Sequence, residues 1–157
     1  MHPNTQLIHT FYTSFQSLDA AGMCACYHSS VVFTDPAFGR LEGDRARAMW
    51  TMLCGRATDL KITFDRVQAD DRTGSAHWEA WYSFGKERRK VHNIIEASFR
   101  FQDGLIIEHT DRFDIWRWSR MALGPVGVLL GWTPFVQAKV RKTALDGLEK
   151  FLEKQTS

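Results

Sequence analysis

The segment Val91–Ile115, VHNIIEASFRFQDGLIIEHTDRFDI, indicates the fold class more clearly than any other part of the chain. Its two halves alternate apolar and polar residues, the period-two pattern of strands that bury one face. Asp103-Gly104 separates the halves, and both central positions of a tight hairpin turn favour residues that tolerate a positive φ. The segment therefore predicts two antiparallel strands, Val91–Gln102 and Leu105–Ile115.

The same period continues upstream of this hairpin. Residues 75–84 form a third alternating run, and residues 60–64 form a fourth that slips at residues 65–66, as strands do at a β-bulge. Nearer the N-terminus, Val31–Thr34 predicts a short strand that ends at Asp35-Pro36, because proline has no backbone N–H to donate. These runs predict a four-stranded meander with one more strand before it.

Helical patterns lie on the N-terminal side of the meander. Apolar residues at helical spacing predict a helix that starts at residue 4 or 5 and runs to residue 17. Asp19 can cap a short second helix. Asp44 can cap a third helix, which we expect to end at Gly55.

Two apolar stretches follow the meander. Gln137–Lys154 predicts an amphipathic helix in which Asp146 can pair with Lys150. Met121–Val136 is also apolar, but it is shorter than the roughly 20 residues that a membrane-spanning helix needs, and glycines and prolines interrupt it. We expect this second stretch to form a buried or interfacial lid.

The order of these elements predicts an α+β fold of one domain, residues 1–157. Three N-terminal helices pack on one face of a curved antiparallel sheet, which leaves a cone with one open end. The extra C-terminal helix belongs to an extension, residues 116–157, packed on or beside this body. A chain of 157 residues suits one domain, and no linker or repeat divides it.

Composition argues against several classes of partner. The net charge is only +2, and the basic run at residues 86–90 has no interleaved aromatic residues, so we predict no nucleic-acid partner. Three cysteines form an odd count without metal-ligand spacing, which is typical of a reducing, cytoplasmic location. The N-terminus lacks the pattern of a signal peptide. Association with a membrane surface through Met121–Val136 is a third-ranked option.

Two ionisable residues share the apolar face of the last strand. His109 and Asp111 have the same parity as Leu105, Ile107 and Phe113. Burying them costs several kcal/mol (roughly) unless they are paired or hydrogen-bonded. They can therefore be a catalytic pair or a satisfied polar cluster near the mouth of the cone.

Asp35 is a third catalytic candidate, because it ends a strand with apolar neighbours; it can equally be a turn-starting residue before proline. A metal site has weaker support, since the chain has no His-Glu-x-x-His or paired-cysteine spacing. Four other histidines and glutamates of the meander lie on the parity opposite to His109: His77, Glu79, His92 and Glu96. We therefore predict no metal and no cofactor.

Several short motifs resemble the nuclear transport factor 2-like superfamily, over about Thr5 to Trp116. They are FYTSF at residues 11–15, FTDP at residues 33–36, Gly43 before a helix, and the last two strands around Asp103-Gly104. The chain looks most like the SnoaL-like and ketosteroid-isomerase-like branches. The resemblance implies a pocket in the cone and a homodimer through the outer sheet face. Residues 116–134 resemble an extension found in bacterial members.

Carrying the branch motifs over residue by residue gives a partial match. Asp35 falls where ketosteroid isomerases place their proton-shuttling carboxylate, but Phe11 and Ala97 occupy the positions of their oxyanion-binding tyrosine and acid. Asp111 matches the final aspartate of limonene epoxide hydrolases, whereas Trp78 and Ala80 replace the other two members. SnoaL-like polyketide cyclases, which use a pocket aspartate and histidine, are the remaining analogy.

The resemblance implies a cofactor-independent acid–base enzyme that acts on a small apolar carbonyl or polyketide-like substrate. Asp111 would move a proton, His109 would orient it or donate to the developing oxygen, and Asp35 would act at the mouth. The alternative is a non-catalytic module for ligand binding or dimerisation. The residues expected to bind the substrate are Phe11, Trp50, Trp78, Tyr82, Asn93, Ala97 and Phe99.

Overall fold

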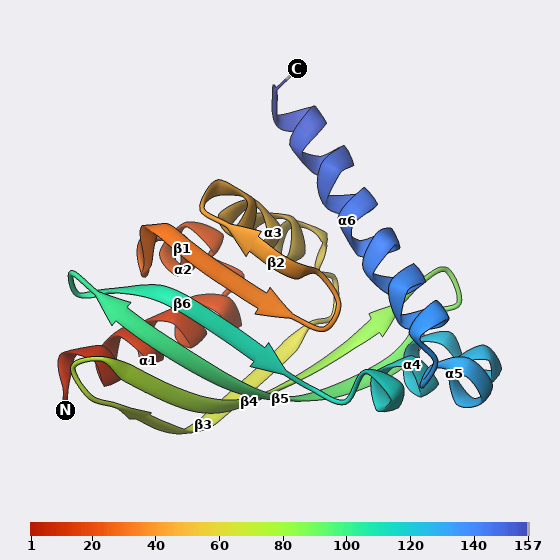
Figure 1. Ribbon diagram of the computed structural model, residues 1–157, viewed down its shortest axis with the longest axis horizontal. Helices are drawn as coiled ribbons and strands as arrows, with labels where there is room; N and C mark the ends of the chain where they lie inside the picture. The colour runs from red at the N-terminus through yellow and green to blue at the C-terminus, as the bar shows by residue number, and fades with distance from the viewer. Residues whose placement is uncertain (157) are drawn as a thin grey trace.

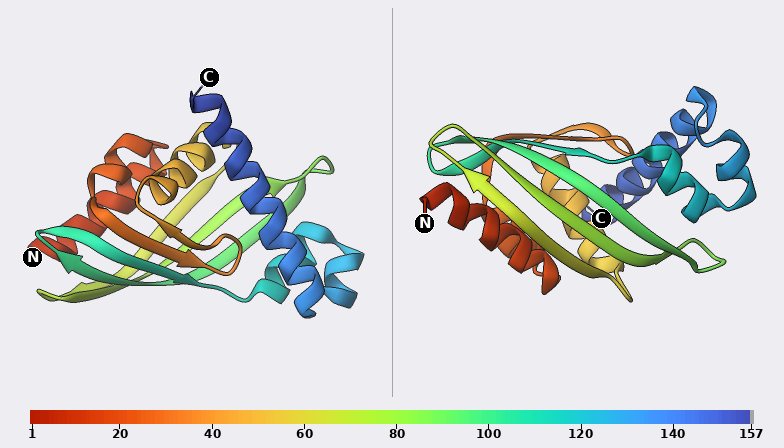
Figure 2. Two further views of the ribbon diagram at one scale, coloured as in Figure 1. Left: turned by 45° about the horizontal axis from the view of Figure 1, so that its top comes forward. Right: turned by 90° about the horizontal axis from the view of Figure 1, so that it is seen from below.

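The computed structural model describes residues 1–156 and shows a six-stranded sheet. The strands are β1 (Tyr27–Asp35), β2 (Gly39–Glu42), β3 (Lys61–Ala69), β4 (Thr73–Phe84), β5 (Arg89–Gln102) and β6 (Leu105–Arg112), in the spatial order β2-β1-β6-β5-β4-β3. All pairings are antiparallel except that of β1 with β6, which is parallel. The sheet curves strongly, as the two views of Figure 2 show.

Three helices cover the concave face of this sheet (Figure 1). They are α1 (Pro3–Gln16), α2 (Ala20–Ala25) and α3 (Asp44–Arg56). Helix α1 buries Ile8, Phe11, Tyr12 and Phe15, four residues at the spacing of one helical face. The α+β fold with helices packed on one face of a curved sheet is therefore confirmed.

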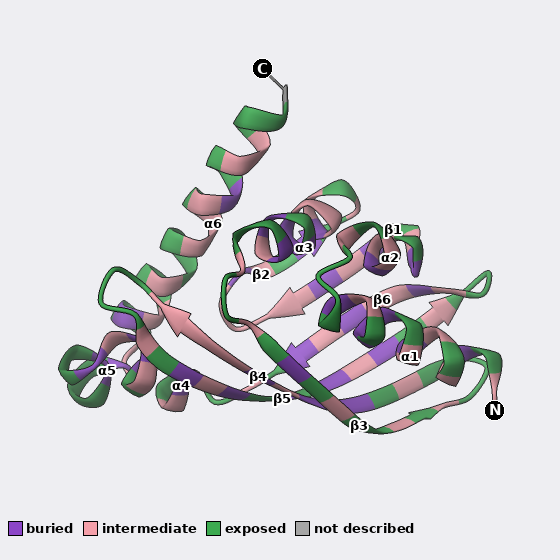
Figure 3. Cartoon of the chain, turned by 180° about the vertical axis from the view of Figure 1, so that it is seen from behind, coloured by how far each residue is buried: buried purple, intermediate pink, exposed green. Residues whose placement is uncertain are grey.

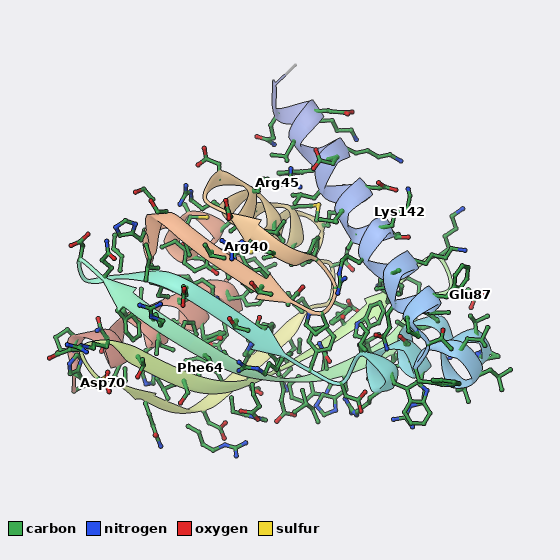
Figure 4. All side chains as sticks on the ribbon, in the orientation of Figure 1. Arg40, Arg45, Phe64, Asp70, Glu87 and Lys142 are labelled. Carbon is green, nitrogen blue, oxygen red and sulfur yellow. The ribbon has the colours of Figure 1, made fainter. Side chains whose placement is uncertain are left out.

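The C-terminal part consists of α4 (Ile115–Leu123), α5 (Pro125–Leu130) and α6 (Pro134–Thr156). Helix α6 packs against α3 and crosses the open end of the cone (Figure 1). Its Leu148 is fully buried in the main core, and Arg45 of α3 reaches α6 to form an ion pair with Glu149 at 2.5 Å (Figure 4). None of the described helices is long and apolar enough to cross a membrane.

One predicted hairpin turn and one predicted β-bulge are confirmed in detail. Asp103 and Gly104 have φ values of 56° and 74°, as a tight hairpin turn between β5 and β6 requires. The register of β3 against β4 shifts between Asp65 and Gln68, and Arg66 has a φ of 52° within this bulge.

Strand ends are less well predicted. The last strand stops at Arg112 rather than Ile115, because Asp114 accepts hydrogen bonds from two backbone N–H groups and caps α4. β1 begins at Tyr27, four residues before the predicted strand, because Tyr27 still pairs with Ile106 of β6, ahead of a register irregularity that extends to Val32. β2 was not predicted, since four residues give too few alternations to detect.

Three predictions about the helices were wrong: the start of α3, the end of α3 and the ion-pair partner of Asp146. Gly43, with a φ of 54°, is the residue before α3, and Asp44 is instead the first helical residue. The helix continues through Gly55 to Arg56. Asp146 pairs at 2.8 Å with Lys142, one turn before it, rather than with Lys150 one turn after; both lysines have the same spacing, so the sequence did not discriminate between them.

Candidate active site

A cavity of about 950 Å³ lies between the sheet, α3 and the C-terminal helices. Most of its walls are apolar side chains, among them Phe33, Trp50, Trp78, Phe113 and Trp118. Four of its polar lining residues come from four different strands: Asp35, Tyr82, Asn93 and Asp111. A mostly apolar concavity with a few convergent polar groups is typical of a small-molecule site.

Behind Asp111 a chain of buried hydrogen bonds crosses the core. Trp50 Nε1 donates to the hydroxyl of Tyr27 at 2.8 Å, and this hydroxyl lies 2.8 Å from Nδ1 of His109. His109 Nε2 lies 2.9 Å from Oδ1 of Asp111. His109 is 0% exposed and Asp111 is 4% exposed, so both predicted inward orientations are confirmed.

The indole of Trp50 gives this chain a direction, because an indole N–H can only donate. The Tyr27 oxygen accepts that bond, and burial raises the pKa of Tyr27 well above its ordinary value, so its hydroxyl keeps the proton. In the neutral tautomer of His109 that accepts this proton at Nδ1, the imidazole proton is on Nε2. His109 therefore donates to Asp111, whose Oδ1 also lies 3.3 Å from the indole nitrogen of Trp78.

The two carboxylate oxygens of Asp111 therefore differ in their hydrogen-bond partners. Oδ1 accepts the bonds from His109 and Trp78, whereas Oδ2 has no hydrogen-bond partner within residues 1–156. Since Asp111 lines the cavity, Oδ2 is the atom available to a bound molecule. A fixed carboxylate with one free oxygen in apolar surroundings has the geometry of a general base.

Asp35 is the second carboxyl group of the cavity. Burial, and to a lesser degree the charge of Asp111, raise its pKa from 3.8 to about 7, although Phe38 N donates to its Oδ1 at 2.6 Å. The parallel pairing of Phe33 with His109 sets the end of β1 beside β6, which is why the two carboxyl groups share one cavity. A carboxyl group that titrates near neutrality can give or take a proton.

Two further polar groups in the cavity wall are able to donate. The side-chain amide of Asn93, a residue 7% exposed, forms no hydrogen bond with any described residue. The hydroxyl of Tyr82 accepts a bond from Trp118 Nε1 at 2.7 Å, which leaves its own proton free. Burial raises the pKa of Tyr82 to about 12, so the hydroxyl stays protonated.

The structure brings together only some of the residues that the sequence indicated. Asp35, Trp50, Trp78, Tyr82, Asn93 and Asp111 line the cavity. By contrast, Phe11, Ala97, Phe99 and His109 are at most 2% exposed and pack behind the lining. His109 is enclosed by aromatic rings, the nearest being Phe99 at a centroid distance of 4.5 Å. It can orient Asp111 but does not reach the cavity.

Tyr27 is the functional candidate that sequence reasoning missed. It has the same parity as Val31 and Phe33, so this signal was present once the strand was extended to its true start. The cavity residues of α4 to α6 were missed as well, because helical periodicity does not say which neighbour a face packs against.

The outer face of the sheet carries a separate polar network. Glu79 lies 2.8 Å from His77 Nε2 and 2.6 Å from His92 Nε2, and Glu96 lies 2.5 Å from His77 Nδ1. As predicted from parity, the sheet separates these residues from His109. In the described part of the chain, no group of three or more His, Cys, Asp or Glu side chains is arranged to hold a metal ion.

Comparison with known proteins gives one family. The model of the SnoaL-like domain matches residues 8–109. No curated protein matches the chain.

Several solved structures share the fold at 21% identity or less, so they bear on the fold alone. An LEH-like epoxide hydrolase from M. tuberculosis is 20% identical with a TM-score of 0.65, covering 81% of this chain and 94% of its own. TsrD from Streptomyces laurentii is 21% identical with a TM-score of 0.65, covering 78% and 95%. A candidate polyketide cyclase from Xanthomonas campestris is 17% identical with a TM-score of 0.63, covering 76% and 96%.

Proposed function

Because the chain belongs to the SnoaL-like domain family of the nuclear transport factor 2-like superfamily, we propose that it is a cofactor-independent acid–base enzyme for a small apolar carbonyl compound. The observation that carries this proposal is the state of Asp111. One of its oxygens is fixed by His109 and Trp78, and the other is left to an apolar cavity of about 950 Å³. The reaction class is a cyclisation or isomerisation by proton transfer.

In the proposed step, Oδ2 of Asp111 takes a proton from the carbon next to the carbonyl group of the substrate. The electron pair of the broken C–H bond moves toward the carbonyl oxygen, which becomes an enolate. In this proposal the Asn93 amide and the Tyr82 hydroxyl, which both line the cavity, donate to that oxygen, a role for which the family motifs offered no residue. Asp35, with a pKa of about 7, can protonate the product or the oxygen.

The experiment measures proton abstraction directly. The protein is incubated in D2O with aryl ketones and 1,3-diketones that raise its melting temperature, and deuterium at the carbon next to the carbonyl is followed by NMR. Asp111→Asn should slow exchange by about 10²-fold or more, the usual contribution of a positioned base. Asp146→Asn, on the exposed side of α6, is the matched control and should exchange at the wild-type rate.

The alternative function is ligand binding without chemistry, which the apolar cavity also suits. In that case the same ketones would raise the melting temperature without any exchange. Exchange that is equally fast in Asp111→Asn would refute the role of Asp111. Loss of exchange with the melting temperature and ketone binding retained would support it.

A further inference from the structure

Helix α5 turns its large apolar side chains outward and its glycines toward the protein, the reverse of an ordinary surface helix. Gly127 and Gly131 are buried against α4, and a Cβ atom on Gly127 would overlap the backbone oxygen of Ser119. The large side chains therefore face outward, so that α5 is mostly exposed in Figure 3. The exposed residues are Val126, Val128, Leu129, Leu130, Trp132 and Phe135, at 48% to 76%. We call these six residues the apolar cap.

An exposed apolar patch of this kind is typical of a surface that binds another protein, a membrane or a ligand. The charges around the cap favour a negatively charged partner, because residues 114–146 contain five basic residues against two acidic ones, Asp114 that caps α4 and Asp146 that pairs with Lys142. Four of the five are exposed: Arg120, Lys139, Arg141 and Lys142. A symmetric contact between two copies through the cap would bring these like charges together, which disfavours a second copy as the partner.

The aromatic residues of the region suit the interface between water and lipid. Trp132 is 61% exposed, and Trp116 is 38% exposed with the Arg120 guanidinium 4.5 Å from its ring centroid. Tryptophan and arginine are the residues that sit at the headgroup level of bilayers. A short helix with outward Leu and Val side chains offers apolar contacts that suit the acyl region below the headgroups.

A second basic element lies beside the cap. Arg89 Nε donates to the backbone oxygen of Met121 at 2.9 Å, which fixes the β4–β5 hairpin next to α4. The hairpin tip, residues 86–90, carries four basic residues with Glu87 among them, and Figure 4 places Glu87 on the same side of the molecule as Lys142. Asp59 lies 3.5 Å from Arg88 and 3.6 Å from Lys90, so this element adds a smaller positive charge beside the cap than its four basic residues suggest.

The apolar cap borders the cavity. Val126, Leu130 and Phe135 belong to the apolar cap and also line the cavity. We propose that the apolar cap docks the protein on an anionic lipid bilayer, with the mouth of the cavity turned toward the acyl chains. An apolar molecule dissolved in the bilayer would then reach the cavity without crossing water. The docking itself does not depend on the proposed chemistry.

The test is co-sedimentation of the full chain with vesicles of phosphatidylcholine and phosphatidylglycerol in a 3:1 ratio, compared with vesicles of phosphatidylcholine alone. We expect binding to the anionic vesicles, weaker binding to the neutral ones, and weakening by salt. The double variant Leu129→Ser/Trp132→Ser should bind at least ~10-fold more weakly, because both side chains lose their apolar contact with lipid. Neither residue lines the cavity.

The matched control is Leu18→Ser, which changes an apolar residue of 39% exposure in the turn after α1 and should bind like the wild type. Replacing Lys139 and Lys142 by alanine should weaken binding to the anionic vesicles by about tenfold and leave neutral vesicles unaffected. Each variant is compared at an unchanged melting temperature, so that loss of binding is not loss of folding.

Three results would overturn the proposal. The first is no sedimentation with either kind of vesicle. The second is vesicle binding that the Leu129→Ser/Trp132→Ser variant retains in full. The third is a dimer in analytical ultracentrifugation that this variant abolishes, which would assign the apolar cap to contact between two copies.

Discussion

Replacing Asp35 by asparagine isolates the cost of burying a carboxylate in the cavity. Burial raises the pKa of Asp35 to about 7, against an ordinary value of 3.8. Between these two values the folded protein holds a proton that the unfolded chain has released. Stability must therefore fall as the pH rises from about 4 to about 7, and the full cost is felt above pH 7.

The size of this cost follows from the same pKa values. At about 1.4 kcal/mol for each pH unit between them, the largest possible loss is ~4 kcal/mol. The measured loss should be smaller, because Asp35 keeps some contact with solvent and accepts a hydrogen bond from Phe38 N at 2.6 Å. Asparagine retains an oxygen for that bond and carries no charge, so Asp35→Asn should remove the pH-dependent loss.

The assay is urea unfolding of both proteins at half-unit steps from pH 4 to pH 8.5. The difference in unfolding free energy, variant minus wild type, should rise with pH and level off above about pH 7 to 8. Asp70→Asn is an informative contrast, since backbone N–H groups of Thr73 and Arg72 lower the pKa of Asp70 below its ordinary 3.8; its pH-dependent change therefore lies below about pH 4, and its difference curve should be nearly flat from pH 5 to pH 8.5. A flat difference curve for Asp35→Asn would refute the reasoning.

Three further predictions concern the core and the C-terminal helices. Tyr27→Phe leaves the Trp50 indole N–H unpaired in the core and should lower the unfolding free energy by ~1–3 kcal/mol. Tyr12→Phe removes a buried hydroxyl that has no hydrogen-bond partner within residues 1–156, so this variant should be as stable as the wild type or more stable. Chemical denaturation of the two variants measures both effects. Leu148→Ala should cost ~2–5 kcal/mol in the same measurement, because this fully buried side chain joins α6 to the main core, and a loss below 1 kcal/mol would show that α6 is not anchored there. Gly127→Ala should separate α5 from α4, since the added methyl group has no space there, and limited proteolysis should then cut near α5 at protease concentrations that leave the wild type intact.

Strand parity predicted the central pair of the site correctly. Side chains alternate across a strand, so the positions of His109 and Asp111 among apolar residues were enough to turn both inward. The same rule could not say how deep each one lies. Parity gives the face of a sheet, whereas the depth of His109 depends on the rings of Phe11, Phe33 and Phe99, which arrive from three other segments of the chain.

The direction of the hydrogen-bond chain was also beyond the sequence. It depends on Trp50 from α3 meeting Tyr27 from β1, a contact between residues 23 positions apart in different elements. Neither the start of β1 nor the parallel pairing of β1 with β6 has a local signal. Without them, the role of His109 was left open between orienting Asp111 and donating to a substrate.

The C-terminal helices were predicted by composition but not by placement. The glycines and prolines of residues 121–136 excluded a spanning helix, and they also gave the sharp α4–α5 connection at Gly124, where φ is 64°. Which side of α5 faces outward depended on the close approach of Gly127 to Ser119, a contact that no periodicity encodes. For that reason the sequence alone left a buried lid and an interfacial lid as alternatives, and the exposed apolar cap contradicts only the buried one.

The cavity is built from two consecutive parts of the chain, residues 1–112 and the C-terminal part after them. Asp35, Asn93 and Asp111 come from the first 112 residues, while the walls contributed by Phe113, Trp118 and the start of α6 follow the strand that carries Asp111. Substitutions in residues 113–157 can therefore change the size and shape of the cavity while the carboxyl groups of Asp35 and Asp111 keep their positions. Replacing residues 113–157 by the corresponding segment of another protein should therefore change which molecules the cavity binds.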